Sequence, residues 1–270
     1  VGDMDFDNYG SLDNTRGTLN IEGTFFINGM MAKILNHEGT VWINGGVLHN
    51  SGSGEIYNNA VNNAVDGSYD GGIITGDESS FEIWNEGSIY NAGGKIETDD
   101  GKIVNENQAM LFNKDGGTIS IGPYGSFTNR NGATVNNNGG TITLLKTYAA
   151  NYGVDRFGDK YATITNNGGV INLVGDDLFE NYDGATLDNS GGILNIEQSA
   201  VFDNGRASAY FGAAATGTID NADGGTIIIK EFGFLSNLDG AIKNDGGTVN
   251  NYGGTCEGCE GLGTCEGFCR

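Results

Sequence analysis

Glycine pairs recur along the chain at nearly constant intervals. The pairs begin at Gly71, Gly93, Gly116, Gly139, Gly168, Gly191, Gly224 and Gly246. The successive steps are 22, 23, 23, 29, 23, 33 and 22 residues, and Gly17 and Gly39, which head two earlier units, are also 22 residues apart. One coil of 22–23 residues, lengthened in places by insertions, accounts for all of these steps. A repeat of this length predicts a solenoid in which each coil stacks on the next.

Each coil is predicted to contain three short strands. After the glycines, apolar residues alternate with residues that would face outward, as on a half-buried strand. The inward residues expected on this first strand are Ile119, Ile121, Ile142, Leu144, Ile171, Leu173, Leu194, Ile196, Ile227 and Ile229. A second strand follows about ten residues later and is centred on Phe127, Phe179 and Phe202, and a third carries Val135 and Ile164. The sequence therefore predicts an all-β fold, a single parallel β-solenoid of about ten coils over residues 1–254.

Asparagine follows the central apolar residue of the second and third strands by two positions. The second strands supply Asn129, Asn181, Asn204 and Asn237, and the third strands supply Asn137, Asn166, Asn189 and Asn244. In parallel stacking, like residues lie over like. We therefore expect two Asn ladders whose amides bond along the axis, as in cross-β structures. Glycine and asparagine also suit the corners, because both tolerate positive φ.

The longer steps place three insertions, at about residues 60–69, 148–159 and 205–216. All three are expected on the way into the third strand, and therefore on one side of the rod. They are either tolerated surface loops or a contact face, since the last two contain Tyr148, Tyr152, Phe157, Tyr210 and Phe211 and exposed aromatic residues favour interfaces.

The net charge of −22 with 13 Lys and Arg argues against nucleic acid as a partner. Regular carboxylates could collect a structural calcium ion. No apolar run approaches the length needed to span a membrane. The chain begins with Val1, which we interpret as a mature end left after removal of a leader peptide, and we expect an extracellular, cell-surface location.

All four cysteines lie in residues 255–270, which we expect to form a Cys-rich cross-linking tail outside the solenoid. They are Cys256, Cys259, Cys265 and Cys269, with the spacing C-x2-C-x5-C-x3-C. Disulfides are favoured over a zinc site, because the two halves are closer together than in zinc ribbons and an even cysteine count in a secreted chain usually indicates disulfides. Whether the bonds form within one chain or between chains stays open.

Catalytic signatures are absent from the sequence. The Asp99-Asp100 and Asp176-Asp177 pairs lie in Gly-flanked turns, where aspartate commonly makes local hydrogen bonds. His37 and His49 are the only histidines, and no nucleophile or phosphate-binding motif occurs. We expect no catalytic residues, no bound cofactor and no enzyme activity. A polysaccharide-acting β-helix enzyme is the third hypothesis.

Neither end of the chain shows a helical cap, so the end coils are predicted to join other copies. The acidic Asn/Gly-rich coils, the absent initiator Met and the terminal cysteines resemble the subunits of the tubular sheath of filamentous methanogenic archaea. This resemblance implies a self-assembling homopolymer that forms a sheath, tube or surface layer, locked by disulfides and in contact with other envelope components. The alternative is an adhesin or binding β-solenoid, since bacterial autotransporter and filamentous adhesin passengers share the repeat style but usually lack cysteine.

Overall fold

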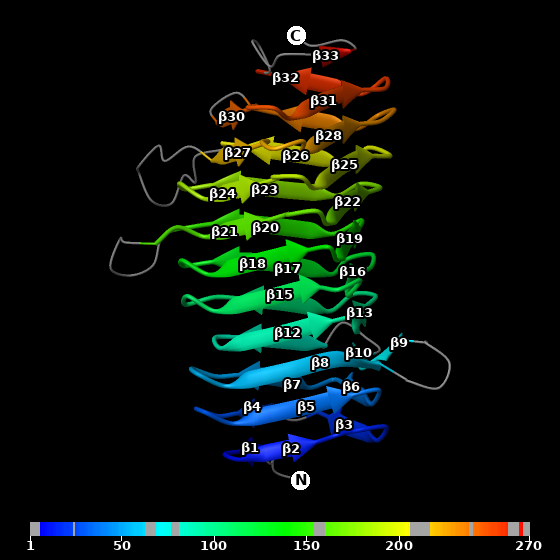
Figure 1. Cartoon of the computed structure of the whole chain (residues 1–270), viewed down its shortest axis with the longest axis vertical. Coiled ribbons are helices and arrows are strands. Elements are labelled where there is room, and N and C mark those ends of the chain that lie inside the picture. Colours follow the sequence, from blue (N-terminus) through cyan, green and yellow to red (C-terminus); the bar gives the residue numbers. More distant parts are fainter. Residues whose placement is uncertain are drawn as a thin grey trace.

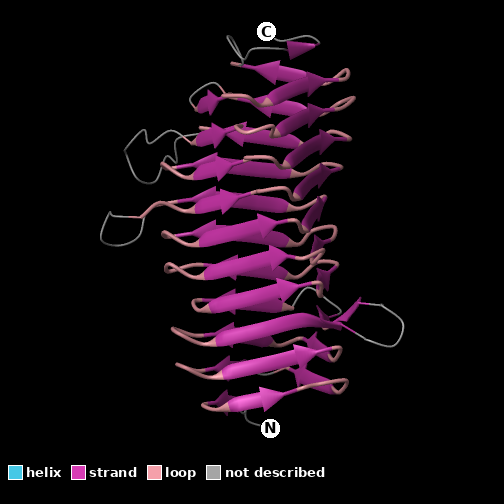
Figure 2. Cartoon of the chain, in the orientation of Figure 1, coloured by secondary structure: helices cyan, strands magenta, loops and turns pink. Residues whose placement is uncertain are grey.

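A computed structural model describes residues 6–23, 25–62, 69–76, 81–153, 160–205, 217–237, 240–258 and 265–266. Every regular element in these segments is a β-strand, and the strands wind into a rod whose termini lie at opposite ends (Figures 1 and 2). Neighbouring strands along the rod are parallel and belong to coils adjacent in the sequence. The prediction of a parallel β-solenoid with three short strands per coil is therefore confirmed.

Three sheets, here named A, B and C, form the faces of the rod. Sheet A contains β1 (Phe6–Asn8), β4 (Phe25–Asn28), β7 (Val47–Asn50), β11 (Glu82–Asn85), β14 (Lys102–Asn105), β17 (Ser126–Arg130), β20 (Tyr148–Tyr152), β23 (Leu178–Tyr182), β26 (Val201–Asn204), β29 (Phe234–Ser236) and β32 (Thr255–Glu257). Sheet B contains β2 (Ser11–Asp13), β5 (Lys33–His37), β8 (Glu55–Asn62), β12 (Ser88–Ala92), β15 (Met110–Lys114), β18 (Thr134–Asn138), β21 (Thr163–Thr165), β24 (Thr186–Asp188), β27 (Thr218–Asp220) and β30 (Ala241–Lys243), with β9 (Tyr69–Gly71) paired to β8. Sheet C contains β3 (Thr18–Glu22), β6 (Thr40–Asn44), β10 (Ile73–Gly76), β13 (Lys95–Thr98), β16 (Thr118–Ile121), β19 (Thr141–Leu145), β22 (Val170–Val174), β25 (Ile193–Glu197), β28 (Thr226–Ile229), β31 (Thr248–Asn251) and β33 (Cys265–Glu266).

Each coil uses one strand of sheet A, then one of B, then one of C. Sheets A and C stack eleven such strands, in agreement with the expectation of about ten coils. The last of these strands, β32 and β33, lie within residues 255–270 and continue sheets A and C.

The core is built from columns of identical or similar residues. Ile119, Ile142, Ile171 and Leu194 lie directly over one another in sheet C, and each is at most 2% exposed. The second column of sheet C contains Ile121, Leu144, Leu173, Ile196 and Ile229, which are also buried, as is Ile227 in the first. Because each column passes through every neighbouring coil, no coil buries its apolar residues without the next.

The phenylalanine column of sheet A is interrupted. Ala149 lies between Phe127 and Phe179 in the register, and all three are buried. Phe179 and Phe202 are direct neighbours, and their rings stack with centroids 4.7 Å apart. The sequence placed the three phenylalanines in one column, and the structure adds the small residue that separates the first from the others.

The inserted stretches do not all lie on one side, which corrects the expectation from the sequence. The first follows β8, between sheets B and C, where β8 and β9 pair in antiparallel fashion. The other two follow β20 and β26, between a strand of sheet A and a strand of sheet B, and so belong to a different corner of the coil. Residues 148–152, part of the expected second insertion, form the regular strand β20. The remaining inserted residues lie largely outside the described segments.

Candidate functional site

The first Asn ladder follows the inner side of the corner between sheets A and B. Its members are Asn8, Asn28, Asn50, Asn85, Asn105, Asn129, Asn151, Asn181, Asn204 and Asn237, and all are buried. The Nδ2 atom of each donates a hydrogen bond to the Oδ1 atom of the next, at 2.6–2.8 Å. The ladder therefore extends through ten coils without a break.

The second Asn ladder follows the corner between sheets B and C in the same way. Its members are Asn14, Asn36, Asn58, Asn91, Asn113, Asn137, Asn166, Asn189, Asn221 and Asn244. The Nδ2-to-Oδ1 distances are 2.7–2.8 Å. Interior members also donate to a backbone carbonyl one coil further on, as Asn137 does to Val170 at 3.1 Å. Buried amides therefore have partners for both donor hydrogens.

Both ladders have the same direction. In every one of these amide–amide bonds the donor lies in the earlier coil and the acceptor in the next coil toward the C-terminus. At the N-terminal end of the first ladder the Oδ1 atom of Asn8 accepts instead from the Gly10 N–H group at 3.1 Å, and at its C-terminal end the Nδ2 atom of Asn237 donates to the carbonyl of Gly258 at 3.0 Å. The two ends of the rod are chemically different.

The glycine pairs are explained by these ladders. The first glycine of a pair has positive φ, for example +72° at Gly139 and +66° at Gly168, where other L-residues are strained. The second glycine packs against the amide of the preceding coil. A Cβ atom on Gly169 would lie 2.4 Å from the Nδ2 atom of Asn137. The repeat that reveals the coils in the sequence is thus needed to make room for the ladder.

The outermost strands of sheet B are less covered than the interior ones. Leu12 in β2 and Ile242 in β30 are only partly buried, whereas Ile34 and Ile219, their neighbours in the same column, are 0% exposed. Sheet B ends at β30 in the described chain, one coil before sheets A and C. At the N-terminal end, Phe6 is 53% exposed although it stacks on Phe26. The N-terminal end of the rod thus presents the edges of its core columns, whereas the described ladders end one coil before β32 and β33.

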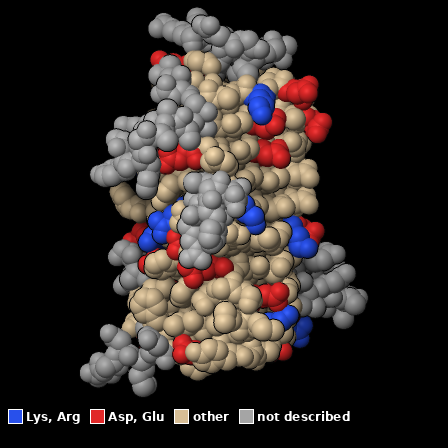
Figure 3. Space-filling view, turned by 90° about the vertical axis from the view of Figure 1, so that its left-hand side faces the viewer, with Lys and Arg blue, Asp and Glu red and all other residues tan. Residues whose placement is uncertain are grey.

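The outer surface mixes charges of both signs. On the face in Figure 3, basic side chains lie beside acidic ones rather than in a separate basic patch. Lys33 bonds to Glu55 at 2.7 Å and Lys102 to Glu82 at 2.9 Å, in each case between adjacent coils. The Arg130 Nε atom bonds Glu106, which is 5% exposed. These pairs reduce the repulsion between like side chains that parallel stacking brings together.

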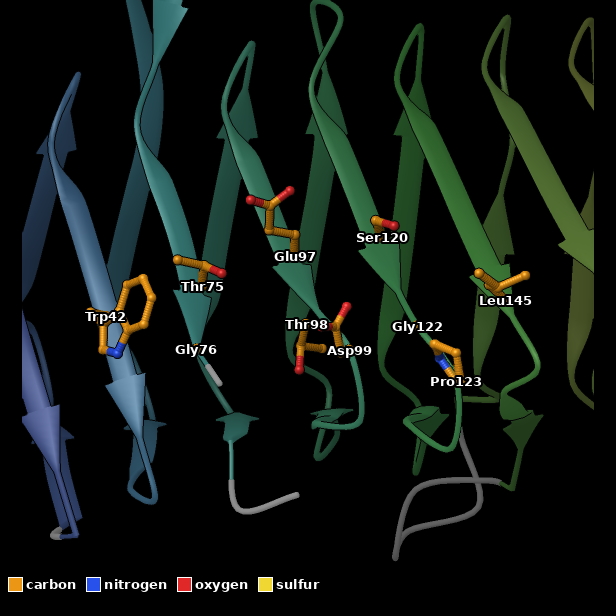
Figure 4. Close-up of a pocket in the computed structure, with 10 residues that line it drawn as sticks. All are labelled: Trp42, Thr75, Gly76, Glu97, Thr98, Asp99, Ser120, Gly122, Pro123 and Leu145. Carbon is orange, nitrogen blue, oxygen red and sulfur yellow. The ribbon is translucent and has the colours of Figure 1, made fainter. Parts of the chain in front are cut away.

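A hollow of about 480 Å³ lies on the outer face of sheet C, beside the corner that leads to sheet A (Figure 4). Trp42, Thr75, Glu97 and Ser120 lie in register on successive strands and form its floor, and Asp99 lies at the rim. This row offers an aromatic ring, hydroxyl groups and carboxylates. Such a set can hydrogen-bond a polar ligand.

Both Asp pairs lie at corners between sheets C and A, as turn residues should. Asp177 is 2% exposed and accepts hydrogen bonds from the backbone N–H groups of Val174, at 2.6 Å, and Thr147. Desolvation raises the pKa of Asp177 to about 6. Asp99 is exposed at the hollow, and the Oδ1 atom of Asp100 is buried without a hydrogen-bond partner.

Two of the four cysteines fall in described strands. Cys256 is 0% exposed and lies over Leu235 in the core column of sheet A. Cys265 is in register with Val249, a core position of sheet C. Cys259 and Cys269 lie outside the described residues. At least one cysteine is therefore part of the packed coil, although the sequence suggested a tail separate from it.

The described segments contain no group of three or more His, Cys, Asp or Glu side chains placed to hold a metal ion. The part of the chain that the structure describes also contains no helix long and apolar enough to cross a bilayer.

The sequence analysis predicted eight ladder positions and missed others. Asn129, Asn181, Asn204 and Asn237 belong to the first ladder, and Asn137, Asn166, Asn189 and Asn244 to the second. Missed members of the first ladder include Asn28, Asn50 and Asn105. Each follows the inward apolar residue of its strand by two positions. The same spacing rule applied to all coils would have found them.

No protein-family model matches the chain, and no curated protein matches it. Among solved structures, the chain is similar to the crystal structure of a TibC-catalyzed hyper-glycosylated TibA55-350 fragment. The TM-score is 0.24 and the sequence identity 15%, over 91% of this chain and 94% of that chain. A similarity at this level carries no argument about function.

Proposed function

We propose that this protein is an extracellular structural subunit that self-assembles by stacking the end coils of its solenoid into a sheath, tube or surface layer. The observation that carries the proposal is the continuity of the core columns and both Asn ladders through ten coils, together with the partial exposure of Leu12 and Phe6 in the N-terminal coil. A strand edge of this kind pairs readily with another chain. The role is structural rather than enzymatic.

Cysteine cross-links complete the proposal. Cys256 and Cys265 take core positions in the last coil, and Cys256 is disulfide-bonded, so a disulfide there would fasten the end of the rod. Disulfides persist in oxidising, extracellular surroundings. The resemblance of the sequence to archaeal sheath subunits supports the same role, with the envelope as the place of assembly.

Electron microscopy of the purified chain, at increasing concentration in oxidising buffer, tests the proposal. We expect fibres, tubes or sheets with a strand repeat of roughly 4.8 Å along the stacking direction. Sedimentation as a single monomeric species at high concentration, with and without calcium, would contradict it. A reductant should loosen the assemblies while circular dichroism still reports the strands, because most of the core contains no sulfur.

A binding role is the second candidate, and the hollow over Trp42 and Glu97 favours it. A surface solenoid of the adhesin type would use this row to hold a polar ligand such as a saccharide. Trp42→Ala should then reduce retention of the chain on immobilised glycans without affecting assembly. Equal retention of both proteins would remove this candidate.

A further inference from the structure

We propose that the hollow on the outer face of sheet C binds a linear saccharide that carries free amino groups, with the sugar chain lying along the axis of the rod. This inference rests on the binding role given above as the second candidate, and it names the class of ligand. It does not depend on self-assembly, because the hollow lies between the second and sixth strands of sheet C, on the side of the rod.

The hollow is long and narrow. It extends along sheet C from Trp42 in β6 to Leu145 in β19, which lie at opposite ends of it in Figure 4. These strands are four positions apart in the sheet, so at ~4.8 Å between neighbouring strands the hollow is about 19 Å long. A volume of about 480 Å³ spread over that length suits a linear chain better than a compact molecule.

The aromatic end of the hollow is suited to a sugar ring. Trp42 is half-buried and lies in register with Thr75, which is also half-buried. The indole ring offers a broad apolar surface, while the hydroxyl groups of Thr75 and Ser120 can each donate and accept hydrogen bonds. A pyranose has an apolar ring face and hydroxyl groups around its edge, so it can use both kinds of surface.

The charge of the hollow discriminates among saccharides. Glu97 lies in the middle of the row and Asp99 at the rim, and the described residues that line the hollow include no Lys or Arg. An anionic chain such as a polyuronate would be repelled by these carboxylates. A protonated amine would be attracted to them, and an amine placed over Trp42 would gain a cation–π contact as well.

Glu97 already binds an ammonium group. The Nζ atom of Lys95 lies 2.9 Å from the Oε2 atom of Glu97, and the two side chains are 55% and 40% exposed. An exposed ion pair of this kind contributes little to stability, so the lysine side chain can turn away into water at small cost. A ligand amine can therefore take the place of the Lys95 ammonium group on the Glu97 carboxylate.

Binding of chemically defined oligomers tests the proposal. The probes are short β-1,4-linked oligomers of glucosamine, N-acetylglucosamine and glucose, which share a linear backbone and differ at one substituent. Isothermal titration calorimetry is carried out at a pH at which the glucosamine amines are protonated. We expect the glucosamine oligomer to bind about 10-fold more tightly than the other two. This preference should disappear when the pH is raised until the amines lose their protons.

Substitutions in the hollow separate the role of charge from that of the aromatic ring. Glu97→Gln should weaken binding of the glucosamine oligomer about 5- to 10-fold and leave that of the glucose oligomer unchanged. Trp42→Ala should weaken both about 10-fold. Glu197→Gln is the matched control, because Glu197 also lies in sheet C and pairs with Lys230 at 2.8 Å, but lies outside the hollow, and it should change neither affinity. Circular dichroism verifies that each variant is folded.

An oligolysine peptide separates recognition of an amino sugar from attraction of positive charge alone. If the peptide binds as tightly as the glucosamine oligomer and Trp42→Ala leaves its affinity unchanged, the hollow recognises charge only and this proposal is wrong. If the glucosamine and glucose oligomers bind equally well, the binding role stands and the requirement for an amine fails. If no oligomer binds, the binding role fails as well, whereas self-assembly is judged separately by microscopy.

Discussion

A ladder asparagine combines one acceptor and two donor hydrogens on a short side chain. The Oδ1 atom of Asn137 accepts from Asn113, and its Nδ2 atom donates to Asn166 and to the carbonyl of Val170. Aspartate has no donor, and glutamine is one carbon longer than the space beside the next glycine permits. The amide is therefore specified by both its hydrogen bonds and its length.

Replacing Asn137 by Ala should lower the free energy of unfolding by about 2–4 kcal/mol, because Asn113 loses its acceptor and Asn166 its donor in a buried site. Urea denaturation followed by circular dichroism measures the change. Asn138→Ala is the matched control, since Asn138 lies on the same strand with an exposed side chain, and should change stability by no more than about 0.5 kcal/mol. Equal effects of the two substitutions would show that the ladder does not stabilise the rod.

Asp177 predicts a pH dependence. Its pKa is raised from 3.8 to about 6 by desolvation, so the folded chain binds this proton more tightly than the unfolded chain does. The contribution of Asp177 to stability is therefore largest below pH ~4 and declines as pH rises through about 6. Asp177→Asn should remove this decline. The free energy of unfolding of the variant, minus that of the unchanged protein, should therefore increase by about 1–3 kcal/mol as the pH rises from 4 to 7. Asp245→Asn, at an exposed position, controls for the change in net charge; a parallel shift in both variants would refute the assignment.

At the scale of one coil, the Asn ladder depends on the Gly–Gly corner. Positive φ at the first glycine turns the chain, and the absent Cβ of the second lets the amide approach. A methyl group on Gly169 would lie 2.4 Å from the Nδ2 atom and 2.5 Å from the carbonyl oxygen of Asn137. Because one of these atoms is a backbone carbonyl oxygen, the clash can be relieved only if the backbone of both coils shifts.

Gly169→Ala should therefore cost about 1–3 kcal/mol of unfolding free energy through overpacking. Gly10→Ala should be nearly neutral, because no atom lies within 4 Å of the added carbon and φ at Gly10 is not positive. Thermal denaturation of both variants in the same buffer gives the comparison. A destabilised Gly10→Ala protein with an unaffected Gly169→Ala protein would contradict this account of the corner.

The sequence predicts elements well where the residue type is dictated by geometry. The glycine spacing revealed the coils because only glycine fits there, and Ile142 or Leu173 could be placed because strand side chains alternate. Strands β32 and β33 were missed because Cys256 and Cys265 occupy positions that earlier coils fill with Leu235 and Val249.

The side of each insertion was harder to predict than its existence. A step of 33 residues reports the length of a coil but not the corner at which residues were added. The hollow at Trp42 could not be foreseen either, since it depends on corner residues from several coils that approach only in the folded rod.

At the scale of the whole molecule, the net charge of −22 opposes end-to-end stacking while the end coils favour it. Repulsion between rods acts over the Debye length, which falls from about 30 Å at 0.01 M salt to about 8 Å at 0.15 M. Contacts at the junction act at van der Waals distance and are much less screened. Salt should therefore promote assembly.

Raising sodium chloride over this range should lower the critical concentration for assembly about 3- to 10-fold, as measured by light scattering. Calcium chloride at the same ionic strength separates screening from specific binding. If calcium acts no more strongly than sodium, screening suffices; a much larger effect would indicate carboxylate sites for calcium at the junction. Assembly that weakens as sodium chloride increases would show that attraction between opposite charges outweighs the repulsion of the rods.

The uniform direction of the amides has an electrical consequence. A peptide-like amide carries a dipole of about 3.5 D, and aligned dipoles add. Backbone dipoles in a sheet largely cancel, whereas the side chains of both ladders point the same way through ten coils. The rod therefore has a permanent moment on the order of tens of debye along its axis from side chains alone, with its positive pole at the C-terminal end.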